Sequence, residues 1–333
     1  MVNNSFKKIV IVFLVVLSLP AYSQDPQFSQ FYAHSLYLNP AFTGNTNLDR
    51  VTGVYRNQWT SVPGAFVSYS FAYDHNFSDV NSGLGLMFTK DKAGSGGLKF
   101  TNVAGLYSYN IKINRKWALR SGLKFSYTSR SLDKSRLTFG DQIARGGATE
   151  TIEGFSDGAN SYIDLGTGAI VYSESLWVGA SIDHINQPEQ SFLSGTAFLP
   201  IKLSLHGGYN FLIRENIKGD EESSMTLTYN YKHQQNWNQL DIGAYYNRSG
   251  FVLGMWYRGI PIMKTASLSN NDALVILLGF QSKGLRIGYS YDITISKLAG
   301  DIGGTHEITL VFENPYEKKK IKKKRHFVPC AKF

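Results

Sequence analysis

The sequence has 333 residues and a formal net charge of +9, and aromatic residues make up 14% of it. Its single cysteine, Cys330, excludes a fold held together by internal disulfides. Beyond the N-terminal region the longest apolar run is Ala273–Phe280, much shorter than the roughly 20 residues that a transmembrane helix needs. We therefore expect a chain held by its own large core, or by a sheet that closes on itself.

The first residues have the pattern of an export signal. Two lysines precede an apolar stretch over residues 9–19, and the small-residue sequence Ala21-Tyr22-Ser23 follows. This order is typical of a secretory signal peptide, and the apolar stretch is too short to span a bilayer as a helix. We predict that residues 1–23 are removed before Gln24 and that the remaining chain is exported.

The next segment, residues 24–48, has the spacing of an amphipathic helix. Asp25 can cap a helix that begins at Pro26, and apolar side chains then follow at i, i+3, i+4 and i+8. We predict a periplasmic helix of about three turns that ends at Asn39-Pro40. Two interpretations stay open: it packs at the mouth or in the lumen of the barrel predicted below, or it docks another protein. The candidate partner-binding residues are Phe28, Phe31, Tyr32, Asn39 and Pro40.

From residue 49 onward, apolar and polar residues alternate. In the clearest stretch, one face holds Trp117, Leu119, Leu123, Phe125 and Tyr127. The other face holds Ala118, Arg120, Gly122, Lys124 and Ser126. A period of two is typical of a strand, because successive side chains point to opposite faces. We predict fourteen strands, at 49–58, 65–74, 82–90, 98–111, 117–128, 161–172, 176–184, 200–212, 224–232, 239–247, 250–258, 273–281, 284–296 and 304–313.

The connections between these strands favour a membrane barrel over a soluble two-sheet protein. Every second connection is short, as at 112–116 and 173–175, although 213–223 breaks the rule. The others are longer and polar, at 129–160, 185–199, 259–272 and 297–303. Outer-membrane barrels have this asymmetry, with tight periplasmic turns and long outer loops. The predicted fold is all-β, a transmembrane antiparallel outer-membrane β-barrel over residues 49–313, with both termini in the periplasm.

Charged residues recur on the face of the strands that would line the lumen. We expect them to form a structural ion-pair network, and they are Asp164, Asp241, Asp292, Arg120, Lys124, Lys202, Lys232, Arg258 and Arg286. The most site-like pair is Asp183-His184, but adjacent strand residues face opposite ways and cannot act on each other. No nucleophile elbow, zinc-protease motif or phosphate-binding loop is present. We predict no enzymatic activity, no metal and no cofactor.

The C-terminal tail, residues 314–333, carries most of the net charge. Eight basic residues against Glu317 give it +7, and Lys7 and Lys8 supply the remaining +2, so residues 24–316 are neutral. The tail could be simply solvated, meet an acidic periplasmic partner, or approach an anionic bilayer surface, where each cation contributes about 1 kcal/mol. For an exported chain we expect no nucleic-acid partner. Its candidate partner-binding residues are Lys318, Lys319, Lys320, Lys322, Lys323, Lys324 and Arg325.

Four stretches of the sequence resemble the PorP/SprF family. They are Asp25–Phe31, Leu38–Gly44, Leu137–Gln142 and Val178–Pro188. The resemblance implies an outer-membrane barrel associated with the type IX secretion and gliding apparatus, in which some members serve to secrete or retain surface adhesins. It also implies partners among the components of that machinery in the periplasm and outer membrane.

On this interpretation, the loops at 129–160 and 185–199 would contact a secreted adhesin, and both terminal segments would contact periplasmic components. Two alternatives stay open. One is an outer-membrane channel for small or apolar solutes. The other is an outer-membrane hydrolase, for which His184, Asp164 and Asp241 would be the residues to test.

Overall fold

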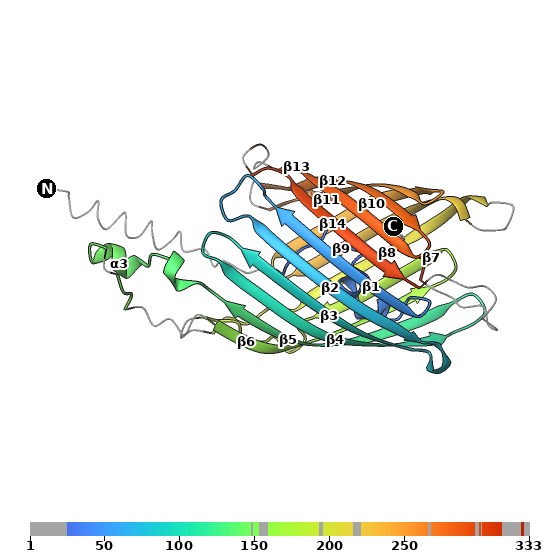
Figure 1. The fold of residues 1–333 in the computed structure, drawn as a ribbon, viewed down its shortest axis with the longest axis horizontal. Coiled ribbons are helices and arrows are strands. Elements are labelled where there is room, and N and C mark those ends of the chain that lie inside the picture. The colour runs from blue at the N-terminus through green and yellow to red at the C-terminus, as the bar shows by residue number, and fades with distance from the viewer. Residues whose placement is uncertain are drawn as a thin grey trace.

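The computed structural model describes most of the chain (Figure 1). The described residues are 25–147, 149–152, 159–192, 196–215, 221–265, 268–296, 300, 302–314 and 328–329. The predicted signal peptide and the lysine-rich part of the tail lie outside these ranges, so the predictions that concern them stay predictions.

The chain folds into a closed barrel of fourteen antiparallel strands, as predicted. Each strand pairs with its neighbour in sequence, and β1 (Asp49–Gln58) pairs with β14 (Thr305–Glu313) to close the sheet. Figure 1 shows the strands running obliquely to the long axis of the barrel. The other strands are β2 (Phe66–Phe77), β3 (Ser82–Ala93), β4 (Leu98–Lys112), β5 (Ala118–Ser131), β6 (Ala159–Tyr172), β7 (Leu176–Asp183), β8 (Lys202–Glu215), β9 (Glu221–Gln234), β10 (Trp237–Arg248), β11 (Phe251–Thr265), β12 (Leu268–Ser282) and β13 (Leu285–Thr294).

The alternating pattern divides each strand between the outside and the lumen. In β5 the outward side chains of Leu123 and Phe125 are 60% and 57% exposed, whereas those of Arg120 and Ser126 face inward and are buried. Closure pairs every strand on both sides, so the backbone polar groups are satisfied where water is absent. The outer surface is therefore an apolar belt, and the charged side chains of the strands, such as Arg120, point into the lumen.

The connections sort to the two ends of the barrel. The long ones at 132–158, 184–201 and 295–304 share what we call the long-loop end, and the opposite end is the short-turn end. The loop at 132–158 contains η3 (Lys134–Arg136) and α3 (Gly140–Ala144), and Figure 1 shows α3 beyond the barrel. Among the described residues, no helix is long and apolar enough to cross a membrane.

One predicted loop is wrong. Residues 259–272 are largely strand, because β11 extends to Thr265 and β12 begins at Leu268, past the predicted ends. The pairing of these strands shifts register after Arg258, where Gly259 has a φ of 139°. Gly259, Pro261 and Asn270-Asn271 are typical of turns, which is why the sequence predicted a loop. Strands β8 and β9 likewise extend into the predicted link at 213–223.

Candidate functional site

The N-terminal segment fills the lumen of the barrel. We call residues 25–46 the lumenal segment. Its side chains are almost entirely buried: Phe28 is 3% exposed and Phe42 is fully buried. The predicted three-turn helix is wrong, because the only helical turns here are α2 (Ser35–Leu38) and the 3₁₀ turn η1 (Pro40–Phe42).

The lumenal segment runs from the long-loop end to the short-turn end. Asp25 contacts His184, which directly follows β7 and begins the long connection 184–201. At the other extreme, the Asn76 side chain donates to the Thr46 carbonyl oxygen over 2.8 Å, next to the short turn after β2. The segment thus lies within the barrel instead of extending into the periplasm, and its first described residue is at the long-loop end.

The first anchor of the lumenal segment is the carboxylate of Glu307 in β14. It accepts hydrogen bonds from the backbone N–H groups of Ser29, over 2.7 Å, and Gln30, over 2.8 Å. Arg56 Nη1 of β1 lies 2.9 Å from the same carboxylate, and all of these side chains are fully or almost fully buried. Donors that a helix would have used for its own turns are therefore bonded to the wall, which explains the absence of the predicted helix.

The hydroxyl of Ser29 extends this anchor across the lumen. It donates to Asp292 Oδ2 of β13 over 2.6 Å and accepts from Arg258 Nη2 of β11 over 2.9 Å. Arg258 also bonds Asp292 over 3.0 Å and Asp241 of β10 over 3.0 Å. Each buried carboxylate thus faces a guanidinium group. Removing one partner of such a buried pair costs about 3–5 kcal/mol, because the other charge is left uncompensated.

The second anchor of the lumenal segment is Asp25. Its carboxylate accepts from Lys202 Nζ over 2.7 Å and from His184 Nε2 over 2.9 Å. The other ring nitrogen of His184 lies 3.0 Å from Asp164 Oδ1. Burial alone lowers the pKa of His184, but Asp25 and Asp164 outweigh it and raise that pKa to about 9. The imidazolium form therefore holds the N-terminal end of the segment between two carboxylates.

The predicted ion-pair network in the lumen is confirmed for eight of its nine residues; Arg120 is buried in the lumen, but it forms no ion pair with a described residue. Asp183 pairs with Lys124 and with Lys202, the latter over 3.5 Å, and does not pair with the adjacent His184. Asp183 was not predicted as a member of this network. Of the predicted residues, Lys232 lies 3.7 Å from Asp241, and Arg286 lies 2.9 Å from Glu313. The pairs Arg50–Asp74 and Arg56–Glu307 were not predicted, although all four residues have the inward phase of their strands.

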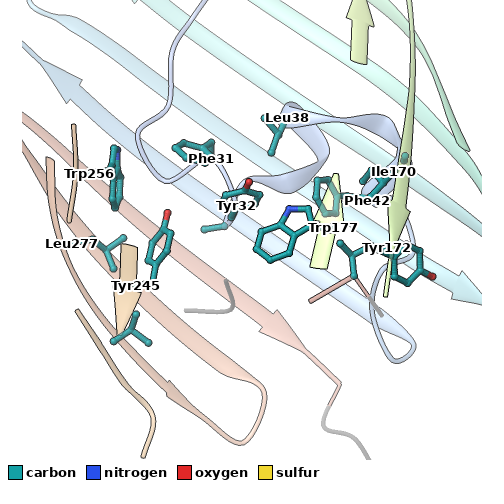
Figure 2. Packing of buried hydrophobic residues seen from close by; sticks show 14 of the residues in the cluster. Phe31, Tyr32, Leu38, Phe42, Ile170, Tyr172, Trp177, Tyr245, Trp256 and Leu277 are labelled. Atoms are coloured by element: carbon teal, nitrogen blue, oxygen red, sulfur yellow. The ribbon is translucent and has the colours of Figure 1, made fainter. Parts of the chain in front are cut away.

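Apolar packing completes the filling of the lumen. In Figure 2, Phe31, Tyr32 and Phe42 of the lumenal segment project among side chains of the wall. The ring of Tyr32 makes an edge contact with Trp177 at 5.6 Å, and Phe31 makes one with Trp256 at 6.1 Å. Aromatic pairs of this kind contribute about 0.5–1.5 kcal/mol beyond the area that they bury. The inside of the barrel is a packed core.

Glycines of the wall allow this close approach. A Cβ atom on Gly168 of β6 would lie 2.1 Å from Asn39 Oδ1, and one on Gly122 of β5 would lie 2.3 Å from Ala41 N. A Cβ on Gly83 of β3 would lie 2.5 Å from the Thr43 carbonyl oxygen. These positions explain part of the high glycine content that the sequence shows.

The C-terminal end of the chain also reaches this core. Val328 is fully buried within the same apolar cluster, and its N–H donates to Asn45 Oδ1 over 2.9 Å. At the rim of the short-turn end, the Asn47 side chain donates to the Asn314 carbonyl oxygen over 2.9 Å. The C-terminal end of the lumenal segment and the C-terminal region of the chain are thus held against each other at the short-turn end.

The candidate partner-binding residues divide into two groups. Phe28, Phe31, Tyr32, Asn39 and Pro40 are buried in the lumen, where they contact this chain's own barrel. This corresponds to the first of the two interpretations of the segment, packing in the lumen, and argues against an exposed docking helix. The candidate lysines and Arg325 lie outside the described residues.

A cavity of about 550 Å³ opens above the lumenal segment at the long-loop end. Residues 25–27 form its floor, and strand ends near the long loops form its wall. Aromatic and amide side chains predominate in this wall, including Trp59, Phe66, Trp237 and Gln58. Within the described residues, no group of three His, Cys, Asp or Glu side chains could hold a metal ion.

Several solved structures share the fold at low sequence identity. The toluene transporter TbuX of Ralstonia pickettii is 12% identical, covers 85% of this chain and 93% of its own, and has a TM-score of 0.48. The toluene transporter TodX of P. putida is 11% identical, with coverages of 84% and 93% and a TM-score of 0.45. The outer membrane protein Omp33 of Acinetobacter baumannii is 8% identical, with coverages of 81% and 100% and a TM-score of 0.45.

The comparison of family models identifies the chain. No curated protein matches it. The model described as "Type IX secretion system membrane protein PorP/SprF" matches residues 21–312, which include the lumenal segment and the whole barrel. This match confirms the resemblance seen in the sequence. The protein is thus an outer-membrane barrel, and it belongs to the PorP/SprF family of type IX secretion system membrane proteins.

Proposed function

We propose that this protein is a non-enzymatic outer-membrane component or partner of the type IX secretion and gliding machinery, and that it contributes to the secretion or surface attachment of an adhesin-like protein. It acts as a closed barrel to which other proteins bind, and not as a channel. The observation that carries this proposal, together with the family, is the lumen filled and anchored by residues 25–46.

The filled lumen argues against a channel for small or apolar solutes. A solute would have to displace the segment from Glu307, Lys202 and His184. The Glu307 carboxylate would then lose two backbone donors, and Lys202 would lose its nearest carboxylate and keep, among the described residues, only Asp183 at 3.5 Å. Each lost hydrogen bond to a buried group costs about 1–3 kcal/mol, and together these losses oppose the binding of one small solute.

The surroundings of His184 argue against a hydrolase. Asp25 lies 2.9 Å from one ring nitrogen and Asp164 lies 3.0 Å from the other. Both nitrogens therefore face carboxylates, and the ring is held as a cation, so it has no free nitrogen with which to accept a proton from a nucleophile. This geometry is that of a structural anchor.

The two ends of the barrel suit two kinds of contact. By the rule for outer-membrane barrels, the long-loop end faces outward, and there the loops 132–158 and 184–201 would meet a secreted adhesin. The short-turn end faces the periplasm, where the tail with its charge of +7 would meet components of the machinery. In this arrangement the signal peptide is removed, and the barrel links the cell surface to the periplasm.

The proposal is tested by exchanging parts of the protein in cells that lack the native copy. Replacing residues 140–152 with a short Gly-Ser linker should remove the adhesin from the cell surface while a heat-modifiable barrel still accumulates in the outer membrane. Deleting residues 317–333 should weaken the recovery of periplasmic components by cross-linking. Normal adhesin display in cells without the protein, or solute conductance by the wild-type barrel in liposomes, would count against the proposal.

A further inference from the structure

The cavity at the long-loop end has a form and a lining that suit a ligand of its own. Its volume of about 550 Å³ lies within the ~300–1,000 Å³ range of small-molecule sites. The floor formed by residues 25–27 keeps a ligand from passing into the lumen. We infer that this cavity binds a short, neutral carbohydrate at the cell surface. The inference does not depend on the proposed role in secretion.

Aromatic rings supply the apolar part of the site. Trp59, Phe66, Phe100, Tyr162 and Trp237 line the cavity, and each is half-buried, so part of every ring is available to a ligand. A sugar ring presents C–H groups on its faces and hydroxyls around its edge. Its faces stack on aromatic rings, which combine a large apolar area with few rotatable bonds.

Amide and carboxylate side chains supply the polar part. Gln58, Asn271, Asp91 and Asp272 line the same cavity. Amides donate and accept hydrogen bonds, and carboxylates accept them, which matches sugar hydroxyls that do both. A hydrocarbon ligand would leave these groups without hydrogen bonds, and burying a polar group in that way costs about 1–3 kcal/mol.

The charge of the lining favours a neutral ligand. Asp25 on the floor is neutralised by Lys202 and His184. Of the remaining charges, Arg130 is the cation that lines the cavity, and its guanidinium is hydrogen-bonded to Gln190. Asp272 lies 3.9 Å from Arg258, and Asp91 balances Arg130, so the lining has no net positive charge to attract a phosphorylated or sulfated ligand.

The ring of Trp59 is held in place before any ligand arrives. Its backbone has a φ of 61°, a conformation that is rare for a bulky residue and that recurs at binding sites. The next two residues fix it: Thr60 N–H lies 3.5 Å from the Gly304 carbonyl oxygen, and Ser61 N–H lies 3.4 Å from that of Ile302. The ring also packs edge-on against Phe66 at 5.1 Å.

A peptide is the main rival to a carbohydrate. Extended peptides are commonly bound by adding a strand to a free sheet edge. At the long-loop end the pairing is incomplete: β6 pairs with β7 only over residues 167–172, and β10 pairs with β11 only from Asp241. Over residues 163–165 the edge of β6 is already bonded by the Ile185 N–H and the Asn186 side chain. The lining itself consists largely of aromatic, amide and carboxylate side chains, which favours a ligand that is compact and rich in hydroxyls.

The test uses the full-length barrel purified in detergent and isothermal titration calorimetry. The neutral probes are maltotriose, laminaritriose and chitotriose, and the rival probes are a chondroitin sulfate disaccharide and the peptide trialanine. We expect at least one neutral probe to bind, and Trp59→Ala to weaken that binding at least tenfold. Trp117→Ala is the matched control, because Trp117 lies at the short-turn end and should leave the affinity unchanged.

Folding of each variant is checked by its heat-modifiable migration on gels. If Trp59→Ala does not fold, Trp237→Ala and Asp91→Asn take its place, with the same expected loss. The inference is overturned if no neutral probe binds, if binding survives the loss of both tryptophans, or if the sulfated or peptide probe alone binds.

Discussion

Glu307 offers the sharpest test of how the lumen is closed. Its buried carboxylate accepts the N–H groups of Ser29 and Gln30 and faces Arg56. The substitution Glu307→Ala leaves Arg56 with Asp292, 3.1 Å away, as its remaining carboxylate, and leaves two backbone donors without acceptors, at about 1–3 kcal/mol each. A loss of 3 kcal/mol already shifts an equilibrium by more than a hundredfold.

We expect this cost to release the lumenal segment and not to unfold the barrel, because the strand pairing of β14 with β1 and β13 uses backbone groups that the substitution leaves in place. The assay is ion conductance in planar bilayers. Wild-type protein should be closed, and Glu307→Ala should show openings whose frequency falls when the segment is held by a cross-link to the wall.

Glu313→Ala is the control for this experiment. Glu313 also faces inward from β14 and pairs with Arg286 over 2.9 Å, but it lies at the rim, away from Ser29 and Gln30. The Glu313→Ala barrel should stay closed. A Glu307→Ala barrel that is folded and as silent as the wild type would refute the view that this carboxylate holds the segment.

Three further predictions concern the other contacts of the segment. The pKa of His184 is raised from 6.5 to about 9, so the stabilising effect of the protonated ring is complete below pH 6.5 and is lost as the pH rises through about 9. Closure of the barrel should therefore weaken between pH 7 and 10, and His184→Gln should remove this pH dependence in conductance measurements. Gly168→Ala should lower the unfolding temperature or open the barrel, because its Cβ would meet Asn39 and overpacking costs about 1–3 kcal/mol, whereas Gly53→Ala, which meets nothing within 4 Å, should behave as wild type. Val328→Asp should speed maleimide labelling of Cys330, because an unpaired carboxylate cannot stay in the apolar cluster; an unchanged rate would show that the docked end does not protect the thiol.

The barrel was predictable from the sequence because a strand, and the direction in which each of its side chains points, can be recognised from neighbouring residues. The alternation around Phe125 and the inward phase of residues such as Asp292 are visible within ten residues, and the structure confirms both. The lumenal segment was not predictable in this way. Phe28, Phe31 and Tyr32 have helical spacing, but the acceptor of the Ser29 N–H is 278 residues away in sequence. The spacing of neighbouring residues cannot show that a carboxylate so distant in sequence accepts the N–H groups that a helix would need.

The anchor at Glu307 brings together parts of the barrel that are synthesised first and last. Arg56 belongs to the first strand, Glu307 belongs to the last, and the N–H groups that they hold belong to the segment made before either. A chain that lacks its final strand lacks the acceptor for the Ser29 and Gln30 N–H groups and, of the two anchors, keeps only the one at Asp25. Full anchoring of the lumenal segment therefore requires a complete barrel. In an incomplete barrel the N-terminal residues would be more accessible to a protease.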